Sequence, residues 1–197
     1  MAQKTGIKLS IEILRNGGVG VMPTDTIYGL VGSALLPGTV KRIYKLRKRN
    51  LKKPMIILIG SLRDLELFKV RLTGNEKNLL DKLWPGKVSV VLPLPAGRQV
   101  VQKFSYLHRG TKSLAFRLPR LKWLRQMLLE TGPLVAPSAN WEGKKPATTV
   151  KEARKYFSWA ADFYFDRGKL DSSPSTLVSL KNGRVRVLRE GAVKIKL

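Results

Sequence analysis

The sequence predicts an α/β fold with a twisted, mixed sheet, and three observations lead to that prediction. Short apolar runs alternate with amphipathic stretches along the chain, which is typical of strands connected by helices. Near the C-terminus two strand-like runs flank Asn182-Gly183, a strong hairpin signal, so at least one strand pair should be antiparallel. Because 197 residues are few for two domains, we expect a single domain over residues 1–197.

Each predicted element has a local signal. Apolar runs bounded by Pro, Gly or charged residues predict strands, whereas apolar residues three and four apart predict helices. Ser61 with Asp64, and Thr149 with Glu152, match the capping box that opens a helix. In chain order we expect strand 18–24, helix 39–49, strand 54–60, helices 61–68 and 75–84, strands 87–95 and 113–119, helix 121–130, strand 133–140, helix 148–157, and strands 161–165, 175–180 and 184–188.

Positive charge dominates the composition. Lys and Arg number 38 against 13 Asp and Glu, which leaves a formal charge of +25. Such an excess implies polyanionic partners. Three interpretations stay open: a solvated basic surface, a surface that binds tRNA or double-stranded RNA directly, and a pocket for phosphates.

Missing residue types exclude several chemistries. The chain has no cysteine and a single histidine, His108, so a disulfide framework, a thiol nucleophile and a zinc site built from Cys or several His are excluded. The apolar runs are much shorter than the roughly 20 residues that span a bilayer. Glu12 and Arg15 interrupt the apolar part of the N-terminus, so we expect no signal peptide and a cytoplasmic location.

Residues 23–30, PTDTIYGL, follow the first predicted strand. Taken alone, they predict a turn in which Asp25 and the threonines bond to nearby backbone and Gly29 adopts a positive φ. The alternative is a site for a polar ligand, and the three stretches described next favour that alternative.

Three further stretches offer groups that could hold an anion. Six of the twelve residues 43–54 are Lys or Arg, which predicts either a solvated helix end or a phosphate clamp. Ser138 and Asn140 lie two apart in a predicted strand end, so they should face one ligand, with a capped turn as the alternative. Arg117 interrupts an apolar strand, and a buried arginine needs an anionic partner, either a ligand carboxylate or an Asp or Glu.

Six stretches, in order and at compatible spacing, resemble the motif series of the YrdC family, the threonylcarbamoyl-AMP synthases. The resemblance runs from about Gly17 to Ala192. It implies a YrdC-like fold of the short, single-domain type, with a mixed sheet flanked by helices around a basic central cleft. The stretches are GGVGVMPTDTIYGL, IYKLRKRNLKKPMIILI, LWPGKVSVVL, SLAFRLP, PLVAPSANWEG and STLVSL with RVRVLREGAV.

The resemblance implies a nucleotidyltransferase that joins L-threonine, bicarbonate and ATP into L-threonylcarbamoyladenylate and pyrophosphate. In the family, partner proteins then transfer the threonylcarbamoyl group to an adenosine of tRNA. Adenylyl transfer needs in-line positioning and charge neutralisation more than a strong base, which suits a site rich in Arg and poor in His. Mg²⁺ is expected as the cofactor, held by ATP phosphates and water, with Asp25 as the nearest carboxylate.

Motif by motif, the resemblance implies roles for individual residues. Arg47 stands where the family usually has a lysine, so a planar fork replaces a point charge. Leu58 stands where many long members carry a histidine. The threonine side would comprise Thr26, Arg117, Ser138 and Ser175; the ATP side Arg49, Lys53, Ser113, Asn140, Thr148 and Arg189; and the catalytic group Arg47, Arg49, Ser138 and Asn140.

A function of another class stays open. A non-enzymatic RNA-binding or ribosome-assembly factor on the same scaffold would also explain the charge. Cations gathered inside the cleft favour the enzyme, whereas a convex basic face with exposed Trp123, Trp141 and Trp159 favours RNA. The related carbamoyl-transfer modules of hydrogenase maturation proteins belong to long chains with cysteine-rich zinc-binding parts, and this chain has neither.

Overall fold

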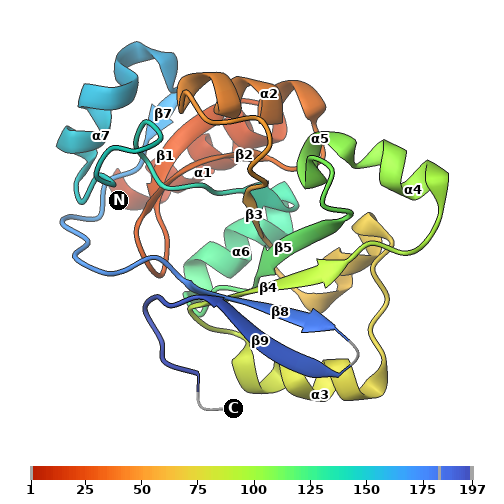
Figure 1. Ribbon diagram of the computed structural model, residues 1–197. Coiled ribbons are helices and arrows are strands. Elements are labelled where there is room, and N and C mark those ends of the chain that lie inside the picture. The colour runs from red at the N-terminus through yellow and green to blue at the C-terminus, as the bar shows by residue number, and fades with distance from the viewer. Residues whose placement is uncertain (1, 182, 196–197) are drawn as a thin grey trace.

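A nine-stranded sheet forms the centre of the structure, a computed structural model that describes residues 2–181 and 183–195 (Figure 1). Within these residues three neighbouring strand pairs are parallel and five are antiparallel. The predicted α/β fold with a mixed sheet is therefore confirmed, whereas the single domain stays a prediction. From edge to edge the strands are β7 (Phe163–Tyr164), β1 (Val19–Pro23), β2 (Tyr28–Ser33), β6 (Leu134–Val135), β3 (Ile56–Leu58), β5 (Ser113–Arg117), β4 (Val88–Pro93), β8 (Thr176–Lys181) and β9 (Arg184–Arg189).

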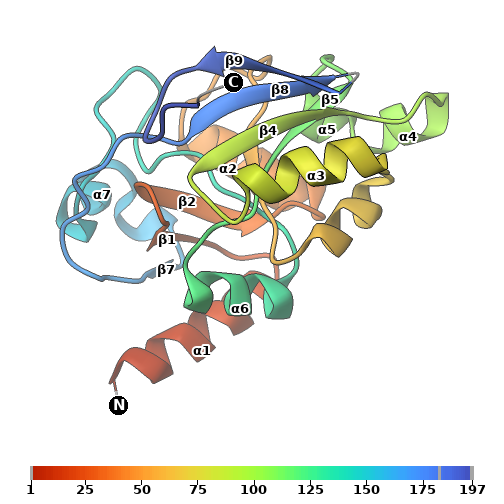
Figure 2. The same cartoon turned by 90° about the horizontal axis from the view of Figure 1, so that it is seen from below.

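Helices cover both faces of the sheet at its β1–β2 end. Figure 2 shows α1 and α6 side by side on one face, where they pack together, and α2 and α7 pack on the other. The helices are α1 (Ala2–Arg15), α2 (Pro37–Leu46), α3 (Gly74–Leu83), α4 (Arg98–Lys103), α5 (Ser105–His108), α6 (Lys122–Thr131) and α7 (Val150–Phe157), with the 3₁₀ segments η1 (Leu62–Phe68) and η2 (Ser158–Ala160).

Alternate residues of β1 and β2 enter two separate cores. Val21 and Leu30 belong to the larger core, which includes α2 and α7, while Met22 and Val31 belong to the smaller core beneath α1 and α6. All four side chains are fully buried. Because both faces are covered, these strands are apolar throughout instead of alternating with polar residues.

The predicted elements are present, with ends that differ by a few residues in most cases. The largest difference concerns residues 133–140, where the strand already ends at Val135. Three helices, α1, α4 and α5, and one strand, β2, were not predicted from the sequence.

The sequence does not predict strand β2, because Gly29 near its start is equally typical of a turn. Gly29 lies inside β2 and is absent from the glycines with positive φ, so the prediction of a positive φ there is wrong. Gly32, farther along the same strand, serves close packing: a Cβ there would lie 2.5 Å from Thr39 Cγ2 and 3.0 Å from Ile43 Cδ1. The glycine therefore lets α2 approach β2, which local sequence does not indicate.

The helix caps follow the prediction in one case and depart from it in the other. Ser61 and Asp64 form the reciprocal capping box that opens η1. Thr149 caps α7 through the Glu152 amide, but the Glu152 carboxylate bonds to the amide (2.7 Å) and hydroxyl (3.1 Å) of Thr148, one residue before the predicted partner. The cap is thus confirmed and the reciprocal half of the box is wrong.

The C-terminal hairpin is confirmed by pairing on both sides of its turn. β8 and β9 are antiparallel, with Lys181 opposite Arg184, and Gly183 has a φ of +68°. Asn182, the other residue of the predicted turn, lies outside the described residues. This hairpin brings the last strand to the edge of the sheet and places Arg189 opposite Leu177.

Candidate functional site

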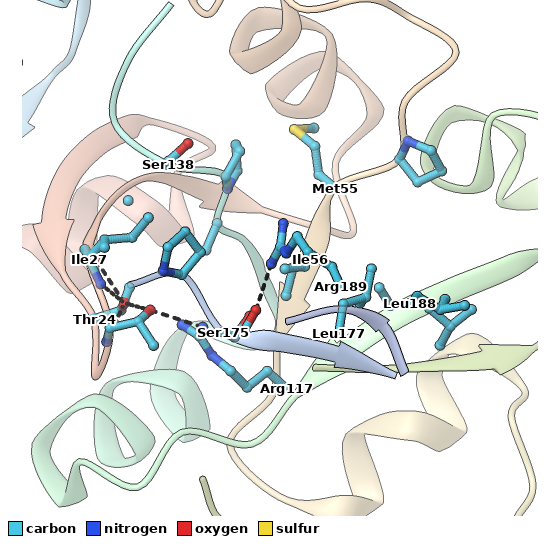
Figure 3. Close-up of a pocket in the computed structure, with 18 of the residues that line it drawn as sticks. Thr24, Ile27, Met55, Ile56, Arg117, Ser138, Ser175, Leu177, Leu188 and Arg189 are labelled. Carbon is cyan, nitrogen blue, oxygen red and sulfur yellow. Dashed lines mark hydrogen bonds between the residues drawn. The ribbon is translucent and has the colours of Figure 1, made fainter. Parts of the chain in front are cut away.

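A cavity of about 430 Å³ opens on one face of the sheet (Figure 3). Its walls come from the β1–β2 turn, the segments before β3 and after β6, and strands β4, β5, β8 and β9. Four lining residues are arginines and none is a carboxylate, so the cavity favours an anionic ligand. The lining comprises Thr24, Thr26, Ile27, Gly29, Arg47, Arg49, Pro54, Met55, Ile56, Val91, Thr111, Ser113, Ala115, Arg117, Ala136, Pro137, Ser138, Pro174, Ser175, Leu177, Leu188 and Arg189.

Strand β5 contributes every second residue to one wall. Ser113, Ala115 and Arg117 line the cavity, whereas Leu114 and Phe116 point to the opposite side and are buried in the core. The small side chain of Ala115 leaves space between a hydroxyl and a guanidinium. A single strand therefore supplies two polar groups to the cavity and two anchors to the core.

The β1–β2 turn closes one end of the cavity. The Thr24 hydroxyl donates to the Ile27 carbonyl (2.8 Å) and accepts from the amides of Thr26 (3.2 Å) and Ile27 (3.3 Å). The predicted turn is confirmed, with Thr24 as its capping side chain. The prediction that Asp25 bonds within the turn is wrong, because its carboxylate faces Arg117 and accepts from the Arg120 amide (3.3 Å).

Arg117 and Asp25 form an ion pair at that end. The Arg117 residue is 4 % exposed, its Nη1 donates to Thr26 Oγ1 (3.1 Å), and its Nη2 lies 3.2 Å from Asp25 Oδ1. Burial lowers the pKa of Arg117, Asp25 opposes that shift, and Arg189 adds to it. Arg117 Nε and Asp25 Oδ1 are both buried without a hydrogen-bond partner in the described part of the chain. The anionic partner that the sequence requires is therefore Asp25, in an incompletely bonded pair.

The Arg47 side chain connects the basic segment, residues 43–54, with the segment that follows β6. Its Nε donates to the Asn140 carbonyl (3.1 Å), and its Nη2 donates to Ser138 Oγ (3.0 Å) and Asn140 Oδ1 (3.2 Å). Its Nη1 is buried and has no partner among the described residues. Two of the three guanidinium nitrogens are thus used by the protein, and Nη1 alone keeps its hydrogen-bonding capacity, as the single nitrogen of a lysine would.

Besides Arg117, three arginines line the cavity: Arg47, Arg49 and Arg189. No carboxylate lines the cavity beside them. Burial, and after it the charge of Arg49, lower the pKa of Arg47 to about 10. Burial and then Arg49 also lower the pKa of Arg189. Carbonyl oxygens orient two of the guanidinium groups, since Arg49 donates to Pro54 (2.8 Å) and Arg189 to Ser175 (2.7 Å). An anion bound here would relieve the mutual repulsion of these cations.

Glu142 links the segment after β6 to the basic segment through hydrogen bonds and an ion pair. Its carboxylate accepts from the Asn50 amide (2.5 Å) and from Lys53 Nζ (2.6 Å), and its own amide donates to the Arg47 carbonyl (2.9 Å). The bonds to Lys53 and Asn50 lower the pKa of Glu142 below 4.5. These contacts are thus kept above pH 4.5 and lost as the pH falls through the lower pKa of the folded state.

ATP is the ligand that the family resemblance implies for these arginines, and we predict that Glu142→Ala weakens its binding about tenfold. The segment that carries Arg47 and Arg49 would lose its link to the segment after β6, while both arginines remain. Isothermal titration calorimetry with ATP measures the change. Glu76→Ala is the control, since Glu76 also accepts from a backbone amide and a side chain, those of Thr73 at the start of α3, and does not line the cavity. Equal affinities of Glu142→Ala and the control would show that this link does not position the arginines.

The structure brings eight of the eleven predicted site residues to the cavity and places three elsewhere. Lys53 pairs with Glu142 at the surface, and the Thr148 hydroxyl bonds to Glu152. The side-chain nitrogen of Asn140, Nδ2, donates to the carbonyls of Trp141 and Lys144 (2.7 Å each). The direct contacts proposed for these three stay predictions. In the lining are Thr26, Arg47, Arg49, Ser113, Arg117, Ser138, Ser175 and Arg189.

Ser138 and Asn140 do not face one way as the sequence predicted. The Asn140 amide donates to the Ser138 carbonyl (3.0 Å), so the chain turns here instead of staying extended. Ser138 lines the cavity, while the Asn140 side chain is 4 % exposed and bonds within its own loop. The two side chains nevertheless meet at one group, because both accept a hydrogen bond from Arg47 Nη2.

Sequence reasoning missed the apolar part of the lining. Met55 and Ile56 follow the basic segment directly, and Leu188 precedes Arg189, so adjacency to predicted ligand-binding residues was the available signal. Figure 3 shows these side chains on the same side of the cavity as Arg189, away from Arg117 and Thr24. The cavity therefore has an apolar part suited to a flat, weakly polar group beside the arginines.

The residues present do not form a protein cage for a metal ion. In the described part of the chain, no three His, Asp or Glu side chains are grouped to hold one. Asp25, the predicted nearest carboxylate, faces Arg117 instead of the cavity.

No helix in residues 2–181 and 183–195 is long and apolar enough to cross a membrane.

Comparisons with known proteins find a family and relatives that match most of this chain. A family model named Sua5/YciO/YrdC, described as telomere recombination, matches residues 12–191. A putative threonylcarbamoyl-AMP synthase of Methanocaldococcus jannaschii is 29% identical over 95% of this chain and 86% of its own length. The threonylcarbamoyl-AMP synthase of Hahella chejuensis is 29% identical over 91% of this chain and 96% of its own length.

Solved structures show the same fold. Pyrococcus abyssi Sua5 complexed with L-threonine superposes with a TM-score of 0.82 at 28% identity, covering 94% of this chain. The match spans 54% of that longer protein, so this chain has about half its length. Escherichia coli YciO superposes with a TM-score of 0.82 at 23% identity over 98% of this chain and 92% of its own, which supports the fold alone.

Proposed function

The chain belongs to the Sua5/YciO/YrdC family, and from this premise we propose that it is an L-threonylcarbamoyladenylate synthase. One observation carries the proposal: four arginines from separate segments converge with hydroxyl groups in a cavity that no carboxylate lines. Relatives named threonylcarbamoyl-AMP synthase, and the L-threonine complex of Pyrococcus abyssi Sua5, support it.

The proposed reaction consumes L-threonine, bicarbonate and ATP. The threonine amine attacks CO₂, supplied by dehydration of bicarbonate, and loses a proton to become a carbamate. A carbamate oxygen then attacks the α-phosphorus of ATP, the bond to the bridging β-phosphate oxygen breaks, and pyrophosphate leaves. The products are threonylcarbamoyl-AMP, pyrophosphate and water, and the transferred group is an adenylyl group, as in a nucleotidyltransferase.

Threonine would lie at the end of the cavity closed by the β1–β2 turn. Arg117 lies at this end beside Thr26, and its ion pair with Asp25 leaves Nε without a protein partner, so this guanidinium would pair with the substrate carboxylate. Ser175 lines the same cavity, with its hydroxyl 2.8 Å from that of Ser89. Ser138 would lie near the carbamate, beside Arg47.

ATP would occupy the part with three arginines. The positive charges of Arg47, Arg49 and Arg189 repel one another in this part of the cavity. A polyphosphate would pair with these guanidinium groups without having to displace a carboxylate of the protein. The free Nη1 of Arg47 supplies one fixed donor for charge that develops during adenylyl transfer. The apolar side chains beside Arg189 would contact the base, and Ser113 the ribose or a phosphate.

Mg²⁺ would enter as a complex with ATP, held by phosphate oxygens and water, because the lining supplies no carboxylate. The adenylate formed would be passed to tRNA-modification proteins that attach the threonylcarbamoyl group to tRNA. A non-enzymatic RNA-binding factor is less well supported, because the relatives are named as synthases.

The proposed function predicts that pyrophosphate release from ATP requires both L-threonine and bicarbonate. A coupled pyrophosphate assay with each substrate omitted in turn measures this dependence. Release that continues at the same rate without threonine, or without bicarbonate, would mean that the protein is not this synthase.

A further inference from the structure

His108, the single histidine of the chain, is buried at the end of α5, and both of its ring nitrogens are bonded. Nε2 lies 2.8 Å from the Val101 carbonyl oxygen, while Nδ1 lies 3.0 Å from the Gly110 amide nitrogen and 3.4 Å from that of Lys112. A carbonyl can only accept a hydrogen bond, and an amide N–H can only donate one. The ring therefore carries a proton on Nε2 and none on Nδ1.

The turn formed by residues 109–112 depends on that ring for two of its amides. Arg109 (φ +50°), Gly110 (φ +96°) and Lys112 (φ +53°) all have a positive φ, which is unfavourable for residues with a side chain. The amides of Gly110 and Lys112 both donate to Nδ1. An acceptor at Nδ1 thus stabilises a backbone conformation that Arg109 and Lys112 disfavour.

This turn positions two hydroxyl groups of the cavity. Thr111 and Ser113 line the cavity, whereas His108 is outside the lining. The Thr111 amide donates to the His108 carbonyl (2.9 Å), and Ser113 Oγ donates to Thr111 Oγ1 (3.3 Å). A different conformation of the turn would therefore move both hydroxyl groups.

The same turn contacts the basic segment. The Arg109 guanidinium lies 4.2 Å from the centre of the Tyr44 ring, and Tyr44 is buried. The Tyr44 hydroxyl donates to the Lys53 carbonyl (2.9 Å), and Arg49 Nε donates to the same carbonyl (3.1 Å). The turn is thus packed against a side chain that shares an acceptor with Arg49, one of the arginines proposed for ATP.

We propose that His108 is a positioning residue for ATP: Nδ1 holds the turn 109–112 so that Thr111 and Ser113 face the nucleotide. This inference rests on the proposed function, which assigns Ser113 to the ribose or a phosphate. The ring itself acts from outside the lining, through the backbone that it bonds. A residue that only fills space would need the volume of the ring but no acceptor at Nδ1.

Two substitutions separate the acceptor from the volume. His108→Asn keeps an acceptor, since the side-chain oxygen can replace Nδ1, and is smaller than the ring. His108→Phe keeps the volume and has no acceptor. We expect His108→Phe to raise KM for ATP about tenfold, with kcat and KM for threonine within about twofold of the parent, and His108→Asn to stay within about threefold of the parent throughout.

Steady-state pyrophosphate release, with ATP and threonine varied in turn, measures these constants. If His108→Asn is impaired and His108→Phe is not, the ring serves only to fill space and the proposal is wrong. An equal KM for ATP in both variants and the parent contradicts it as well.

NMR spectroscopy of the parent, labelled uniformly with ¹⁵N, tests the geometry without any variant. Because the chain has one histidine, we expect one set of ring signals, with the proton on Nε2 and a scalar coupling across the hydrogen bond between Nδ1 and the Gly110 amide nitrogen. A ring protonated on Nδ1, or a ring without that coupling, would overturn the proposal even if His108→Phe fails to fold.

The synthase and the role of His108 fail in different ways. A parent whose pyrophosphate release does not depend on threonine and bicarbonate contradicts the synthase. A parent that shows both dependences, together with a folded His108→Phe variant of unchanged KM for ATP, contradicts only the positioning by His108.

Discussion

Arg47→Ala should lower kcat for pyrophosphate release at least about 100-fold, whereas Arg47→Lys should stay within about tenfold of the parent. The reason is the geometry of the guanidinium, of which Nε and Nη2 are held by Asn140 and Ser138 and only Nη1 is free. A lysine can replace one free donor, and an alanine cannot. Steady-state assays at saturating threonine, bicarbonate and ATP measure the effect.

Two comparisons separate this role from a general loss of charge. Lys41→Ala removes an exposed cation from α2, the helix that precedes Arg47, and should keep full activity. Asn140→Ala should also lower kcat, because Asn140 Oδ1 and the Asn140 loop position Arg47. A fully active Arg47→Ala would remove Arg47 from the catalytic group, and an inactive Arg47→Lys would show that the planar fork itself is needed.

Arg117→Met should destabilise the protein by about 3 kcal/mol and abolish threonine-dependent pyrophosphate release. The substitution leaves Asp25 buried without its cation, since the Asp25 side chain is 3% exposed and that of Arg117 5%. An uncompensated buried carboxylate is costly, and the threonine carboxylate loses its cationic partner. Urea unfolding measures the first effect, and KM for threonine the second.

The double variant Arg117→Met/Asp25→Asn distinguishes the two effects. Removal of both charges should restore most of the free energy of unfolding, because a neutral pair no longer needs compensation. Threonine-dependent release should stay absent, since the carboxylate-binding group is still missing. A double variant as unstable as Arg117→Met would contradict the role of the ion pair, and an unchanged KM would place threonine elsewhere.

Much of the fold could be predicted from local pattern, and the exceptions have physical causes. The capping box of Ser61 with Asp64 and the hairpin between β8 and β9 depend on neighbours in sequence, and both are confirmed. Strand β2 is not predicted because Gly29 also suits a turn, and because Gly32 serves a close approach of α2 that strand propensity does not reflect.

The candidate site could be predicted in residue type better than in contacts. Arg117 in an apolar strand indicated a buried anionic partner, but several carboxylates could have met it, and the structure selects Asp25. Ser138 and Asn140 were expected to face one ligand, and a turn between them gives each a different environment while joining both to Arg47.

The sequence by itself determined the fold class and the family resemblance, because periodicity, caps and motif order are properties of neighbouring residues. It also determined the chemistry on offer, which is many cations and hydroxyls with no cysteine. Only the tertiary structure decided which groups meet. Arg47 bonds to Ser138, 91 residues away in the sequence, and Lys53 pairs with Glu142, 89 residues away. Strand order and helix packing bring those segments together. Such contacts depend on the packing of distant segments, which local sequence patterns do not record.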